Sequence, residues 1–239
     1  WLFEISIHPQ VWGWIFLATF GLLYYNRYKL ALYSLLMIVL GGFSALFLSA
    51  RCVWPVPMDR EAASLTMLNN LLAGVNPYGI DALPGGTFVY GILGPLSAVP
   101  LSWIRGVDIV NLRIMAILFV ISTSVLIGVF AFRELRSISL ALIFCFFTLY
   151  TLMAFPMLGQ ICNALGFLLM MLTILIPHMT KYSVVSLCWS VLFAVLAFFT
   201  KPFFLIGCGF VAFYLFIAVS KRISLLYFFT VIVLILAIL

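Results

Sequence analysis

The chain has 239 residues, of which 67% are hydrophobic and only 8% charged, and its formal net charge is +6. A soluble domain carries roughly a quarter charged residues, so this composition excludes an ordinary soluble protein. The hydrophobic segments are apolar on all sides and do not alternate with polar residues, which predicts membrane-spanning helices rather than the strands of a barrel.

In chain order, these segments predict an all-α, polytopic transmembrane protein with about eight spans of about 20 residues each. The first span is short, and its aromatic residues would also suit a helix lying in the membrane interface. The chain begins at Trp1 and ends within an apolar run, so we expect a single transmembrane domain over 1–239 that continues beyond residue 239. The predicted spans are 11–25, 30–50, 113–132, 138–155, 159–176, 183–199, 203–219 and 223–239.

The basic residues of the short connections are unevenly divided between the two sides of the membrane. The positive-inside rule makes the basic side cytoplasmic, which predicts a multi-pass protein of the cell inner or plasma membrane. No cluster of Lys and Arg is interleaved with aromatic residues, so we predict no nucleic-acid partner. The opposite short connections hold only Lys201, whereas the basic side holds Arg27, Lys29, Arg133, Arg136, Lys181, Lys221 and Arg222.

A long connection, 51–112, is predicted to face outward, and it contains all the aspartates of the chain and most of its prolines. Asp59 or a neighbouring residue can cap a helix that stops near Gly74. A second apolar segment, 88–104, is interrupted by Gly94-Pro95 and by Pro100, so we predict that it does not span. We therefore expect two helices at the outer membrane surface. The apolar face of the first would hold Ala62, Leu65, Leu68, Leu71 and Leu72.

Asp59 and Glu61 lie at the mouth of a span, where carboxylates are costly and often have a role. An outward carboxylate at this place could act as a base on a substrate at the membrane surface. The alternative is that they cap the helix, with a partner in Arg60 or Arg51. Position alone favours the alternative.

The outward-facing cations also have two interpretations. Lys201, which precedes Pro202, lies in apolar surroundings and needs a carboxylate or a bound anion, or else extends to the interface. Arg105 and Arg113 flank the last part of the outward loop, where a guanidinium could bind phosphate or serve as an interfacial anchor.

Gln160 and Asn163 lie three residues apart, and so on one face of a helix at its outer end. They could bind a polar substrate group, although hydrogen bonding between helices is the alternative. The cysteines form no CxxC pair, and His8 and His178 are far apart, so we predict no dedicated metal site. No nucleotide-binding or serine-hydrolase motif is present.

Three pieces in order resemble one family. An outward loop opens with Asp-x-Glu, continues to Gly-x-Asn-Pro-Tyr (Gly74 to Tyr78) and returns through Tyr90 to Gly94-Pro95. Later come Gly159-Gln160-Ile-Cys-Asn163 and Phe199-Thr-Lys201-Pro202. This set, over about 51–205, resembles the polyprenyl-phosphate-sugar-dependent GT-C glycosyltransferases, especially the branch of polyprenol-phosphomannose-dependent α-mannosyltransferases. The family usually has its catalytic loop after the first span, whereas a short candidate span precedes it here.

The resemblance implies inverting sugar transfer on the extracytoplasmic side, from a polyprenyl-phosphate donor in the membrane to a lipid, glycan or protein acceptor. Asp59 would be the general base, with Glu61 as the second candidate, because inversion needs one base and one departing phosphate. The phosphate would be bound by cations, and polar side chains would bind the substrates. The candidates are Lys201, Arg113 and Arg105 for phosphate, and Gln160, Asn163, Tyr78 and Tyr90 for substrate.

No cofactor is predicted, although a divalent cation held by Asp59 and Glu61 is left open, since oxygen ligands suit hard cations. Two other functions are also left open. One is a transporter or flippase of a lipid-linked or polar solute, which would place polar residues and broken helices near the bilayer midplane. The other is a non-catalytic subunit of a membrane complex.

Overall fold

The computed structural model of the chain describes residues 59–77, 91–154 and 161–239, and within these residues it is all-helical. The predicted spans at 11–25 and 30–50 lie outside the described residues. The helices are α4 (Asp59–Leu72), α5 (Leu93–Ser97), α6 (Val99–Arg105), α7 (Ile109–Leu135), α8 (Ile138–Ala154), α9 (Ile161–Met179), α10 (Val184–Thr200), the 3₁₀-helix η3 (Pro202–Leu205), α11 (Ile206–Ala218) and α12 (Lys221–Ile238).

Three of these helices, α7, α9 and α12, are long and apolar enough to cross a membrane. At a rise of about 1.5 Å per residue, α7 alone is about 40 Å long, which exceeds the hydrocarbon thickness of about 30 Å. The apolar helices of α8, α10 and α11 are shorter. The described residues thus have the character of a membrane protein, whereas the count of about eight spans stays a prediction.

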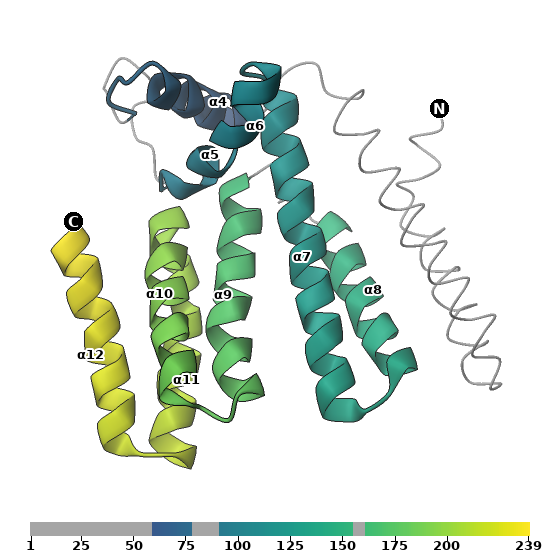
Figure 1. Cartoon of the computed structure of the whole chain (residues 1–239), viewed down its shortest axis with the longest axis vertical. Helices are drawn as coiled ribbons and strands as arrows, with labels where there is room; N and C mark the ends of the chain where they lie inside the picture. Colours follow the sequence, from purple (N-terminus) through teal and green to yellow (C-terminus); the bar gives the residue numbers. More distant parts are fainter. Residues whose placement is uncertain (1–58, 78–90, 155–160) are drawn as a thin grey trace.

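Helices α7 to α12 stand side by side and alternate in direction, while α4, α5 and α6 form a layer across one end of them (Figure 1). The α7–α8, α9–α10 and α11–α12 connections all lie at the opposite end (Figure 1). These three connections, with the turns next to them, contain Arg133, Arg136, Lys181, Lys221 and Arg222. The basic residues and the α4–α6 layer therefore lie at opposite ends of the bundle. We call the end with α4–α6 the layered end and the other the basic end.

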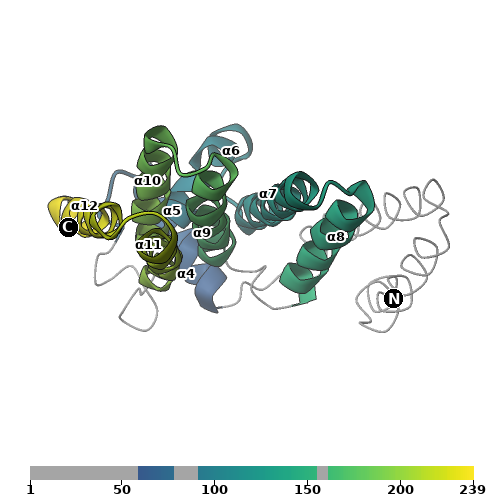
Figure 2. The same ribbon diagram turned by 90° about the horizontal axis from the view of Figure 1, so that it is seen from below.

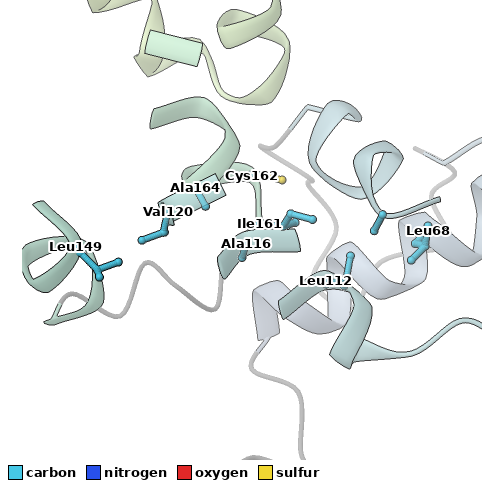
Figure 3. Packing of buried hydrophobic residues seen from close by; sticks show 9 residues of the cluster. Leu68, Leu112, Ala116, Val120, Leu149, Ile161, Cys162 and Ala164 are labelled. Atoms are coloured by element: carbon cyan, nitrogen blue, oxygen red, sulfur yellow. The ribbon is translucent and has the colours of Figure 1, made fainter. Parts of the chain in front are cut away.

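The first hydrophobic cluster joins the layer to the bundle. It runs from Leu68 of α4, through Leu112 and Ala116 of α7 and Ile161 of α9, to Leu149 of α8 (Figure 3). A second cluster joins α10, α11 and α12 around residues such as Val195, Leu215 and Val231. Seen from below, α8 lies on one side of α7, and α9 to α12 lie on the other (Figure 2).

The layer differs in detail from the predicted pair of surface helices. Helix α4 ends at Leu72, and Gly74 follows it with a φ of +68°, a left-handed conformation that glycine adopts readily. In its described part, the interrupted segment 88–104 forms two short helices, of 5 and 7 residues, and the second ends one residue later, at Arg105. Neither α5 nor α6 is long enough to cross a bilayer, because each turn of helix advances only about 5.4 Å.

Candidate functional site

A bidentate ion pair joins the first turn of α4 to the start of α7. The Arg113 Nε donates to Glu61 Oε1 at 2.9 Å, and Nη2 donates to Oε2 at 2.7 Å. The side chains are only 11% and 3% exposed, respectively, so solvent screens the pair weakly. Because both carboxylate oxygens accept from the guanidinium, Glu61 is a poor candidate for a free base or a cation ligand. The sequence did not point to Arg113 as a partner of Glu61. The partners that it suggested for the carboxylates, Arg60 and Arg51, have side chains outside what the structure describes.

The local sequence explains why Arg113, the fifth residue of α7, has a fixed position. Asp108 caps α7, since its Oδ1 accepts from the Val110 backbone N–H at 3.3 Å. Asn111 is fully buried, and its Nδ2 donates to the Gly106 carbonyl at 2.6 Å and to the Ser102 Oγ at 3.3 Å. These bonds hold the end of α6 against the start of α7. The α6–α7 turn therefore fixes the position of the first turns of α7, which include Arg113.

A second contact connects α4 to the start of α9, near the end of α10. The Ser64 side chain lies near the Cys162 thiol, and the charge of Lys201 is close enough to act on the same thiol. Cys162 is buried and also lies 3.9 Å from the Gly91 carbonyl oxygen, measured from its Sγ. Groups from α4, α9 and the α10–η3 junction are therefore close together at the layered end.

Two glycines, one just before α5 and one within it, allow this part of the chain to approach α9 and α10. The Gly91 N–H donates to the Thr200 carbonyl at 2.9 Å, and a Cβ on Gly91 would overlap the Phe199 backbone. A Cβ on Gly94 would likewise overlap the Cys162 side chain. The segment can only lie this close to the ends of α9 and α10 because both residues lack a side chain.

Lys201 ends α10 in an extended conformation, and Pro202 then begins η3. Its backbone N–H donates to Ala197, which closes the last turn of α10, and its side chain is half-buried. Asn163, 5% exposed, lies in the first turn of α9. It directly follows Cys162, whose thiol is close enough to Lys201 for the charge of the lysine to act on it. The structure thus places Lys201 and the start of α9 in one neighbourhood.

The remaining predicted site residues lie either apart from these contacts or outside what the structure describes. Asp59 is the first residue of α4, but its side chain lies outside what the structure describes. Arg105, the last residue of α6, is exposed and is separated from Arg113 by the α6–α7 turn. Gln160, Tyr78 and Tyr90 lie outside the described residues.

Sequence reasoning missed the two contacts of α4 with the bundle. Neither Cys162 nor Ser64 is among the candidate site residues that the sequence predicts. The signal for the ion pair was a lone arginine entering an apolar helix, which requires an anionic partner. The signal for the close approach was the repeated glycine in Gly91-x-x-Gly94. Among the described residues, no group of three His, Cys, Asp or Glu side chains could hold a metal ion.

Comparison of the chain with protein-family models, with curated proteins and with solved structures gives no match in any of the three. The functional argument therefore depends on the ordered motifs of the sequence and on the contacts described above.

Proposed function

We propose that the protein is an integral-membrane, multi-pass inverting glycosyltransferase. It would move a sugar from a polyprenyl-phosphate donor to a lipid, glycan or protein hydroxyl outside the cytoplasm. The observation that carries the proposal is that α4, the start of α9 and the end of α10 come together at the layered end. These segments hold, or directly adjoin, the three ordered motifs of the sequence, and residues that act on one substrate must converge in this way.

In the proposed reaction, Asp59 takes the proton of the acceptor hydroxyl as its oxygen attacks the anomeric carbon of the donor. The new glycosidic bond forms on the face opposite the phosphate, the bond to the phosphate oxygen breaks, and the anomeric configuration inverts. The departing lipid phosphate carries the electron pair, and the Lys201 ammonium offsets its charge. Gln160 and Asn163 supply amide groups to the sugar or the phosphate.

The distribution of polar groups favours surface chemistry over transport. In the described helices α7 to α12, Asp, Glu, Lys and Arg occur only near helix ends. Inside the helices, the hydroxyls of Thr123, Ser124 and Thr173 donate to carbonyls four residues earlier in the same helix. A transporter or flippase would instead place polar groups along a path through the bilayer.

The proposal is tested by transfer of radiolabelled mannose from polyprenyl-phosphate mannose in membranes that contain the full-length protein. Asp59→Asn preserves the shape of the side chain but removes the base, so transfer should fall about a hundredfold or more. Asp108→Asn is the matched control, because asparagine also caps helices and transfer should stay near the wild-type level.

Full transfer by Asp59→Asn at equal expression would remove Asp59 from the mechanism. If the wild type transferred no sugar from mannosyl, glucosyl or galactosyl polyprenyl phosphates, the transporter and the non-catalytic subunit would become the better interpretations.

A further inference from the structure

We infer that Glu61 and Arg113 are a positioning pair that holds the first turn of α4, and with it the backbone of Asp59, against α7. This inference rests on the proposed function for the role of Asp59, although the pair itself is a property of the fold. It assigns Glu61 and Arg113 neither to the base nor to the phosphate site.

The geometry of the pair shows which edge of the Arg113 guanidinium is occupied. The two residues are 52 positions apart in the chain, and they meet through the Nε–Nη2 edge of the guanidinium. That edge is one that would bind two oxygens of a phosphate side by side, and it is filled by a carboxylate. The opposite charge of Glu61 also offsets the attraction that Arg113 would have for a second anion.

The place of Glu61 within α4 links the ion pair to Asp59. Glu61 is the third residue of the helix, so it shares a turn with Asp59. Ser64, one turn later, meets Cys162 of α9, and Leu68, one further turn along, lies in the first hydrophobic cluster. Spacings of three and four residues put these side chains on one helix face. Among the described side chains, these contacts hold the helix to the bundle along its length, and the Glu61 contact lies in the turn that contains Asp59.

The loss of either member of the ion pair should lower the stability of the protein. A buried charge without its counter-ion is strongly unfavourable, because the remaining group is desolvated and unpaired. The removal of either side chain should therefore both destabilise the protein and free the first turn of α4. Lysine at position 113 would keep the charge but lose the fork that fixes the orientation.

The pair is tested first by melting of the purified full-length protein, followed through tryptophan fluorescence. Glu61→Gln and Arg113→Gln should each lower the apparent melting temperature by about 6 °C or more, and the double variant should fall by clearly less than the sum. The control pair is Glu134→Gln and Arg136→Gln, two exposed residues at the other end of α7, with shifts within about 2 °C. If the melting-temperature shifts of Glu61→Gln and Arg113→Gln added up in the double variant, the two side chains would not interact and the inference would be wrong.

The positioning role is tested by the kinetics of mannosyl transfer. Arg113→Lys should lower kcat about tenfold or more, while the KM for polyprenyl-phosphate mannose stays within about twofold. The exchanged variant E61R/R113E restores opposite charges and should recover part of the kcat lost in the single variants. A tenfold rise in the donor KM in Arg113→Lys, without a change in Glu61→Gln, would show that Arg113 binds phosphate and would overturn the inference.

The two experiments separate the inference from the proposed function. If the wild type transfers no sugar, the proposed function fails, and the melting experiment alone decides whether the pair exists. If the wild type transfers sugar but the melting shifts are additive, the function stands and the pair is wrong.

Discussion

Two of the polar contacts between distant parts of the described chain differ in charge and in place. At the layered end, Glu61 and Arg113 form a fully charged pair between α4 and α7. Within the bundle, the Ser190 Oγ and the Tyr227 Oη lie 2.8 Å apart between α10 and α12, and the Ser190 Oγ also donates to the Thr173 carbonyl at 2.7 Å. The second contact is neutral and is surrounded by the second hydrophobic cluster.

The difference follows from the cost of burying charge. Neutral hydroxyls can be enclosed among apolar helices at a small cost when they are hydrogen-bonded, whereas full charges are expensive there and are usually kept for a role. The neutral Ser190–Tyr227 contact therefore indicates a structural role, which is to hold α10 and α12 together. The charged contact indicates a place where orientation is needed at the end of the bundle, next to the motifs that carry the proposed chemistry.

The largest loss of stability should come from a substitution at Gly91. There the backbone of the layer lies directly against the backbone at the end of α10. A Cβ at Gly91 would overlap backbone atoms that cannot rotate away, so Gly91→Ala should cost about 3 kcal/mol or more of stability, the upper part of the range for overpacking. Thermal melting of the purified protein measures this cost. Gly209→Ala is the control, because a Cβ there meets nothing within 4 Å, and alanine favours the helix by up to about 1 kcal/mol. Equal melting temperatures for the two variants would contradict the described contact.

A smaller effect is expected within the bundle. Tyr227→Phe removes one buried hydroxyl but leaves Ser190 bonded to Thr173, so the loss should be about 1 kcal/mol. Thr230→Val provides the comparison, because the exposed Thr230 hydroxyl donates only within its own helix, and the change should stay within about 0.5 kcal/mol. A loss in Tyr227→Phe as large as in Glu61→Gln, measured by the same melting experiment, would remove the distinction between the two contacts.

The smallest effect concerns the basic end. Burial, together with the neighbouring Tyr214, raises the pKa of Tyr182 to about 12, and the two rings stack with centroids 4.8 Å apart. The folded protein thus keeps this proton longer than the unfolded chain, whose tyrosines ionise near pH 10. The contribution of the protonated Tyr182 to stability should be complete below about pH 10 and should be lost as the pH rises to about 12. Melting temperatures over this pH range should fall less steeply in Tyr182→Phe, and parallel curves would contradict the raised pKa.

The helices of the bundle could be predicted from the sequence because hydrophobic runs separated by polar turns determine them locally. The predicted spans 138–155 and 183–199 differ by no more than one residue at each end from α8 and α10. Helix α7 begins four residues earlier than its predicted span, since Asp108 caps it, and a cap adds polar residues that a hydrophobic run does not include.

The site could be predicted only in part, because its contacts join segments far apart in the chain. Residue type and place indicated that Glu61, Arg113 and Lys201 lie at one end, but Glu61 was expected to be a base and the two cations to bind phosphate. Nothing local shows that Glu61 pairs with Arg113 when Arg60 is adjacent in sequence. The face of α4 was also predicted by apolar residues alone, whereas the polar Glu61 and Ser64 are buried with Met67 and Leu68. Polar residues can be buried when a partner on another helix satisfies them.

The central claim is that the layered end is the reactive end, and two lysines that flank α10 test it most directly. Lys201 follows the helix at the layered end, and Lys181 lies in the connection before it at the basic end. In the mannosyl transfer assay, Lys201→Gln should raise the KM for polyprenyl-phosphate mannose or lower kcat by about tenfold or more, as expected for a lost charged contact to phosphate. Lys181→Gln should leave both constants unchanged. An equal loss in the two variants, or a loss only in Lys181→Gln, would contradict the account.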